Sequence, residues 1–133
     1  MRRLLFIALV FALLGFAAPA LAQTVVNPQK VEFDASADHN TIIEGQAFVA
    51  KYELRVSIQG SATVLVKQDL GKPAPVNNRI SLPLTLGLPV SSTIRYIGVV
   101  FAMGPYGEAG STASNPFMFV GPPAAPGTPA VSR

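Results

Sequence analysis

The chain has 133 residues, of which half are hydrophobic, and it carries no cysteine and a formal net charge of +3. The absence of cysteine excludes a disulfide framework, thiolate metal sites and a cysteine nucleophile. Beyond residue 22, single basic residues are scattered among acids, and nucleic acid is set aside as a partner because phosphate binding requires a basic face.

Residues 1–22 are predicted to be a signal peptide for export. Residues 2–3 are both arginine, residues 4–16 are almost entirely apolar, and residues 20–22 (Ala-Leu-Ala) supply the small side chains that a signal peptidase accepts. The apolar run of 13 residues is shorter than the roughly 20 needed to cross a bilayer; the alternative is an uncleaved membrane anchor. Cleavage leaves 111 residues with a net charge of +1 and no second hydrophobic span, which predicts a periplasmic or extracellular protein without a membrane span.

Three segments alternate between apolar and polar residues, as half-buried strands do: residues 31–35, 48–58 and 80–86. The middle one has the clearest pattern, because its even positions are all apolar and Val49 is the sole apolar residue at an odd position. A strand places such even residues on one face, whereas a helix would spread them around its surface. They are Phe48, Ala50, Tyr52, Leu54, Val56 and Ile58. Because Pro83 lies on the outward set of the third segment, that segment is predicted to be an edge strand.

Further strands are predicted over residues 62–67, 94–103 and 117–120. Residues 94–103 are apolar on both faces, which predicts a central place in the sheet. Residues 69–78 contain two prolines and a glycine, so a loop is predicted there, and residues 104–107 are predicted to form a tight loop.

About seven short strands separated by turns predict an all-β fold, an antiparallel β-sandwich. The sandwich is expected over residues 30–121, after a short leader at residues 23–29. Residues 122–133 are predicted to be a disordered tail, because they are rich in proline and Val131 is their one large apolar side chain.

Three pieces of the chain, in this order, resemble a fibronectin type III domain. The pattern Tyr52-x-Leu54-x-Val56 is similar to the family's third strand. The pattern Tyr96-x-x-x-Val100-x-Ala102, followed by a glycine-rich loop and Ser111, is similar to the sixth strand, and Ser114-Asn115-Pro116-Phe117 is similar to the start of the last. The loop at residues 69–73 is similar to a segment common in exported bacterial relatives.

The resemblance covers residues 28–121 and implies an immunoglobulin-like sandwich that binds or spaces other proteins or glycans. Two features depart from the family pattern. The chain has no tryptophan, which the family usually carries in its second strand. Leu88 lies eight residues before Tyr96, two more than the family's usual spacing, so Tyr96 is expected to be packed without a settled tyrosine-corner hydrogen bond.

The sequence contains no catalytic constellation. His39 is the only histidine, and it lacks an evident nucleophile or further metal ligands, so a solvated turn residue is predicted. No G-x-S-x-G elbow or G-x-G-x-x-G loop occurs. Glu32 and Asp34 share an outward face and fit a glycosidase pair in distance only. We therefore predict no enzyme activity, no cofactor and no metal site, and interpret Lys72 as a solubilising charge.

Tyr106 is the one candidate binding residue, because it lies between Pro105 and Gly107 at a loop tip. Exposed tyrosines often anchor interfaces; the alternative is a ring that folds back onto its own sandwich. The predicted function is a non-enzymatic exported module that binds another protein or joins a surface assembly, with an unknown protein or glycan as partner. The alternatives are a carbohydrate-binding module, which usually needs two or three coplanar aromatic rings, and a small exported hydrolase.

Overall fold

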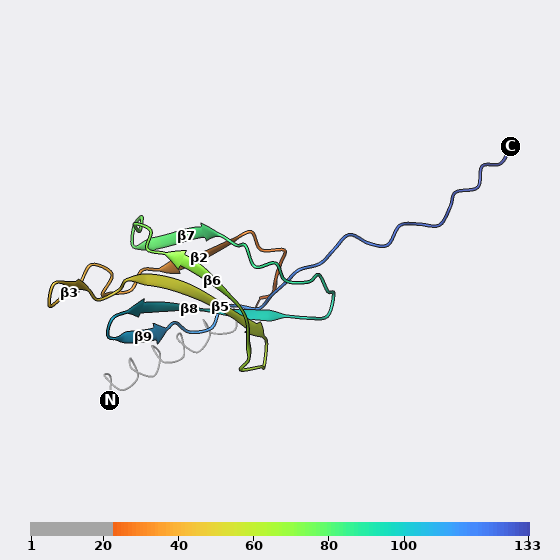
Figure 1. Cartoon of the computed structure of the whole chain (residues 1–133). Helices are drawn as coiled ribbons and strands as arrows, with labels where there is room; N and C mark the ends of the chain where they lie inside the picture. The colour runs from red at the N-terminus through yellow and green to blue at the C-terminus, as the bar shows by residue number, and fades with distance from the viewer. Residues whose placement is uncertain (1–22) are drawn as a thin grey trace, which may run out of the picture.

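The computed structural model describes residues 23–133, which form strands and contain no helix (Figure 1). The predicted signal peptide at residues 1–22 lies outside the described residues. The all-β class predicted from the sequence is confirmed. No helix in the described range is long and apolar enough to cross a membrane.

The described strands form three sheets. A six-stranded sheet has the order β1-β10-β8-β5-β6, with β9 also beside β8, and two small sheets pair β2 with β7 and β3 with β4. The bounds are β1 Val25–Val26, β2 Lys30–Asp34, β3 Ile42–Ile43, β4 Gln46–Ala47, β5 Lys51–Ile58, β6 Val64–Gly71, β7 Arg79–Pro83, β8 Tyr96–Gly104, β9 Gly107–Gly110 and β10 Phe117–Met118. Strand β8 pairs with β5 on one side and with β9 and β10 on the other, so its predicted central position is confirmed.

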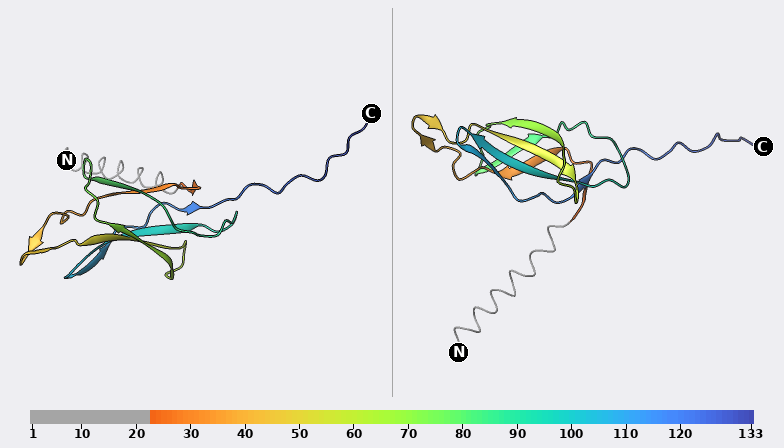
Figure 2. Two further views of the ribbon diagram at one scale, coloured as in Figure 1. Left: turned by 45° about the horizontal axis from the view of Figure 1, so that its top comes forward. Right: turned by 60° about the horizontal axis from the view of Figure 1, so that its bottom comes forward.

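The hydrophobic core lies between the β2–β7 sheet and the six-stranded sheet, which form two layers in Figure 2. Tyr52, Leu54 and Val56 of β5 are almost completely buried, as the alternation of that segment predicts. From the other layer, Ile80 of β7 is buried and Phe33 of β2 packs against the same cluster. Burial of this one face of β5 therefore joins the two layers.

The predicted strand over residues 48–58 begins later than expected. Strand β5 begins at Lys51, and the alternation reverses before it, because Val49 is buried and Ala50 is exposed. The physical reason is that these residues belong to the preceding connection: the N–H of Phe48 donates to the carbonyl of Thr41 at 2.9 Å. The prediction that Phe48 and Ala50 share the inner face of the strand is therefore wrong.

The loop predicted over residues 69–78 also begins too early. Strand β6 continues to Gly71, and its pairing with β5 passes an irregularity between Tyr52 and Glu53 of the partner strand. Leu70 is buried at this point, and a carboxylate oxygen of Asp69 accepts the N–H of Gly71 at 2.8 Å. Burial of Leu70 and this side-chain bond extend the strand despite the glycine.

Strand β7 pairs only with β2, so the edge position predicted from Pro83 is confirmed. Residues 23–29, which the sequence predicts to be a short leader, contain β1, which pairs in parallel with β10. Residues 122–133 are exposed and lie outside every strand, and Figure 1 shows them leading away from the sheets.

Candidate functional site

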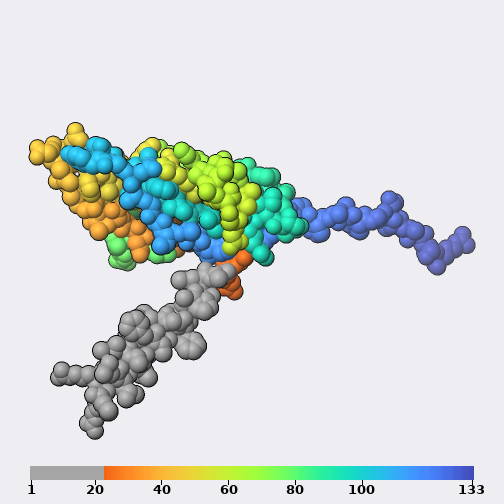
Figure 3. Space-filling view, turned by 90° about the horizontal axis from the view of Figure 1, so that it is seen from below, coloured from red at the N-terminus to blue at the C-terminus, as the bar shows by residue number. Residues whose placement is uncertain are grey.

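Tyr106 lies in the turn between β8 and β9, at one end of the sheets. Its side chain is 56% exposed, and its ring centroid lies 5.9 Å from that of Phe48, with the two planes tilted by 43°. Phe48 directly follows the β3–β4 hairpin, where Ile42 is 70% exposed and Ile43 is also exposed. Figure 3 shows this hairpin region beside the β8–β9 turn. We call Ile42, Ile43, Phe48 and Tyr106 the tip surface.

Glycine at the end of β8 permits the approach of Phe48 to Tyr106. A Cβ at Gly104 would overlap the carbonyl oxygen of Phe48, so only glycine lets this backbone cross the strand. The N–H of Ala50 then donates to the carbonyl of Met103 at 2.7 Å. On the other side of the turn, Gly107 has a φ of 128°, which side-chain-bearing residues rarely adopt. The two glycines thus fix the position of the tip.

The histidine predicted to be solvated is buried instead. His39 does lie in a turn, but its side chain is 8% exposed, and its Nδ1 lies 2.7 Å from the hydroxyl oxygen of Tyr52. The same hydroxyl accepts the backbone N–H of Ser36 at 3.1 Å. The reason for burial is that Tyr52 reaches from β5 to this turn, and its ring stacks on the imidazole. His39 thereby ties the turn to the core.

The two outward carboxylates of β2 form ion pairs. Glu32 lies 2.8 Å from Lys30 and 3.6 Å from Arg79, and Asp34 lies 3.2 Å from Arg79. The hydrogen bond to Lys30, together with the charges of Lys30 and Arg79, holds the pKa of Glu32 below its ordinary value. A glycosidase acid needs the opposite shift, so Glu32 does not have the electrostatics of an acid catalyst. Lys72 is an exposed loop residue.

The outer face of the six-stranded sheet carries a line of half-buried side chains from β8, which include Val99 and Phe101. The guanidinium of Arg55 lies 3.9 Å from the centre of the Phe101 ring. It is held by Glu53 at 2.7 Å and by two bonds to Glu108, at 2.6 and 2.9 Å. These contacts shield the outer face of β8, which the sequence pattern alone did not resolve.

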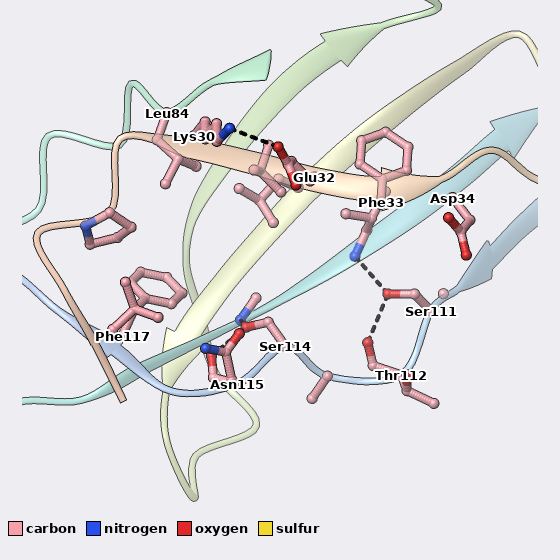
Figure 4. A pocket seen from close by; sticks show the side chains of 18 of the residues that line it. Lys30, Glu32, Phe33, Asp34, Leu84, Ser111, Thr112, Ser114, Asn115 and Phe117 are labelled. Carbon is pink, nitrogen blue, oxygen red and sulfur yellow. Dashed lines mark hydrogen bonds and ion pairs between the residues drawn. The ribbon is translucent and has the colours of Figure 1, made fainter. Parts of the chain in front are cut away.

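A groove of about 1350 Å³ lies between β2 and the chain from residue 109 to 117 and is not predicted by any sequence pattern (Figure 4). Every residue of β2 lines it, and Leu54, Gly98 and Val100 contribute to its lining from β5 and β8. On the side of the groove opposite β2, the backbone between β9 and β10 pairs irregularly with β8. The side-chain oxygen of Ser111 accepts the N–H of Val100 at 3.1 Å, and that of Ser114 accepts the N–H of Gly98 at 2.9 Å.

Within residues 23–133, no three His, Asp or Glu side chains are arranged to hold a metal ion. No protein-family model, curated protein or solved structure matches the chain. The candidate functional surfaces therefore rest on the structure alone. They are the tip surface around Tyr106 and the groove along β2.

Proposed function

We propose that this chain is an exported, non-enzymatic module that binds another protein, and that the tip surface is the contact. We also propose that its layers form an immunoglobulin-like sandwich of the fibronectin type III kind. The burial of Tyr52 and Tyr96, at 2% exposure each, supports the second proposal, since both belong to patterns that resemble that family. Export rests on the pattern of residues 1–22.

The exposure of Tyr106 near a hairpin with exposed Ile42 and Ile43 carries the binding proposal. A tyrosine ring loses little conformational entropy on binding and offers both apolar area and a hydroxyl. Exposed aliphatic side chains beside it are costly in water unless a partner covers them. Loops held by a rigid sheet are a common place for such contacts, and here Gly104 and the bond from Ala50 to Met103 hold the tip.

The two alternatives have less support from the geometry. A sugar usually stacks on aromatic rings that share a plane, whereas the Phe48 and Tyr106 rings are tilted by 43°. A hydrolase would need a free base, whereas the Nδ1 of His39 is engaged with Tyr52 and the outward carboxylates of β2 are paired with cations.

The test is capture from the exported fraction of the source cells with immobilised residues 23–133, followed by affinity measurement with the captured protein. We expect Tyr106→Ala to weaken the complex by about 30-fold, as an interface anchor does, without a change in the melting temperature. Val90→Ala is the control, because Val90 is equally exposed but lies in the connection between β7 and β8.

Three results would contradict the proposal. Tyr106→Ala that binds the captured protein as the wild type does would remove the tip surface from the contact. Tyr106→Ala that unfolds would assign the ring to the core. Specific glycans that bind the wild type and not Tyr106→Ala would favour the carbohydrate-binding alternative.

A further inference from the structure

The sheet formed by β2 and β7 has only two strands in the described part of the chain, although it covers one side of the core. Two-stranded sheets have little stability of their own, and further strands or packing must support them. The groove runs along one edge of this sheet, because all five residues of β2 line it. The groove therefore lies where a third strand would lie.

The alternation of hydrogen bonds along β2 shows which of its backbone groups face the groove. Leu84 N–H donates to the Gln29 carbonyl, and Ala35 N–H donates to the Asn78 carbonyl, each at 2.9 Å. These two bonds lie in the same register as the β2–β7 ladder, so the odd residues of this segment bond to β7. In an antiparallel pair the alternate residues point their N–H and C=O groups away from the partner. These are Lys30, Glu32 and Asp34.

The free edge of β7 is closed by other means. Pro83 has no N–H to offer, and its carbonyl accepts the side-chain amide of Gln68 at 3.1 Å. The N–H of Arg79 donates to the carbonyl of Val76 at 2.9 Å. Proline and side-chain cover are the usual protections of an edge strand. Strand β2 contains no proline, and within residues 23–133 no group outside the sheet bonds to the backbone of Lys30, Glu32 or Asp34. Of the two edges of this sheet, only the β2 edge is open within the described residues.

We infer that the groove accepts an extended segment of a partner protein, which adds to β2 as a third strand. Its backbone bonds to the three N–H and three C=O groups of Lys30, Glu32 and Asp34. Its alternate side chains are apolar and enter the groove above Leu54 and Val100, because side chains of a strand alternate between faces. The remaining side chains lie on the outer face, where basic residues complement the carboxylate of Asp34, whose side chain is 73% exposed.

Three other occupants fit the groove less well. The tail of the chain has four prolines between residues 122 and 133, which cannot supply ladder N–H groups. Residues 23–29 are engaged elsewhere, since Val25 N–H donates to the Pro116 carbonyl at 2.9 Å. A second copy paired antiparallel about the middle of β2 would set Glu32 directly against Glu32 of that copy, and like charges in this position are destabilising.

The test uses a synthetic peptide, acetyl-Lys-Val-Thr-Val-Thr-Val-Lys-amide, with residues 23–133 and amide hydrogen exchange measured by NMR. We expect the N–H groups of Glu32 and Asp34 to exchange quickly in the free protein and at least about tenfold more slowly with about 1 mM peptide. The N–H groups of Val31 and Phe33, which already bond to β7, serve as internal references. The same peptide N-methylated at its threonines and valines lacks edge donors in either strand direction and should give no protection.

Substitutions in the chain test the same edge. Glu32→Pro removes one N–H that faces the groove and none that bonds to β7, so it should abolish the protection of Asp34. Ser81→Pro is the matched control, because Ser81 is the residue opposite Glu32 and its N–H faces the closed edge. Glu32→Gln, which keeps the N–H, should retain binding.

Each contrary result overturns the inference. Absence of protection by the peptide, or equal protection by the N-methylated peptide, would show that the edge does not accept a strand. A wild type that sediments as a dimer, with Glu32 and Asp34 amides already protected, would show that a second copy occupies the groove. If Glu32→Pro does not fold, the two peptides on the wild type still decide the question.

Discussion

The hydroxyl of Tyr52 is the group whose removal should be most informative about the core. Tyr52→Phe keeps the ring in place, including its contact with Phe33 at 5.2 Å between centroids. It removes the partner of two polar groups, the Nδ1 of His39 at 2.7 Å and the N–H of Ser36 at 3.1 Å. The test therefore isolates the polar link between the turn and β5 from the packing of the ring.

The expected loss in the free energy of unfolding follows from the burial of the two groups. His39 is 8% exposed, and a buried polar group without a partner costs about 1–3 kcal/mol. Ser36 is only partly buried, so water can replace part of its bond. We expect a total of about 1.5–3 kcal/mol, which in a domain of this size lowers the melting temperature by roughly 6–20 °C.

Urea unfolding of residues 23–133, followed by circular dichroism, measures the loss. Tyr96→Phe is the matched control, because Tyr96 is equally buried but its hydroxyl makes no hydrogen bond within the described residues. Its ring packs against Phe117 at 5.9 Å, which phenylalanine preserves, so we expect a change below about 0.5 kcal/mol. Equal losses for the two variants, or a loss below about 0.5 kcal/mol for Tyr52→Phe, would refute the reasoning.

Two further predictions concern the tip and the outer face. Gly104→Ala should lower the free energy of unfolding by about 1–3 kcal/mol, because the Phe48 carbonyl must move; Gly110→Ala, where the nearest atoms belong to the Phe101 side chain, should cost less in the same urea assay. Glu108→Gln should change the pH dependence of stability. Arg55 lowers the pKa of Glu108, so the contribution of the carboxylate is present above its unfolded pKa and is lost as pH falls through the folded pKa. The wild-type advantage in urea midpoint should therefore be present at pH 7 and disappear on acidification; an advantage that grows toward acid would contradict it.

Strand β5 was predictable because its apolar and polar residues alternate, as they do in a strand with one buried face. Its side chains from Tyr52 to Val56 are spaced by two and buried, which needs no knowledge of the rest of the chain. Three of the four two-residue strands were not predictable for the opposite reason, whereas β10 lies within the strand predicted over residues 117–120. Strands β1, β3 and β4 have two residues each, too few for a period, and their partners rather than their own composition determine them.

The tip was predictable only in part. Tyr106 is indicated by its turn neighbours, which are local in sequence. The approach of Phe48 to Tyr106 depends on the space above Gly104, more than 50 residues away in the chain. The alternation of even positions over residues 48–58 therefore assigned Phe48 to the wrong face. His39 was misread in the same way, because its partner Tyr52 lies on another element. Local patterns locate turns, but they predict burial and contacts between elements only where a period reveals them.

The chain lacks the tryptophan that the resembled family usually carries in its second strand, and the β2–β7 sheet has only two strands in the described part of the chain. An open edge of this kind invites self-association unless charges protect it. Lys30, Glu32 and Asp34 supply such charges, and Arg79 neutralises the acids from β7. Because these charges lie on the outer face while the backbone groups of the same residues face the groove, the edge can resist its own copy and still admit a strand whose outward residues are basic. One set of residues then serves both solubility and selection of the partner strand.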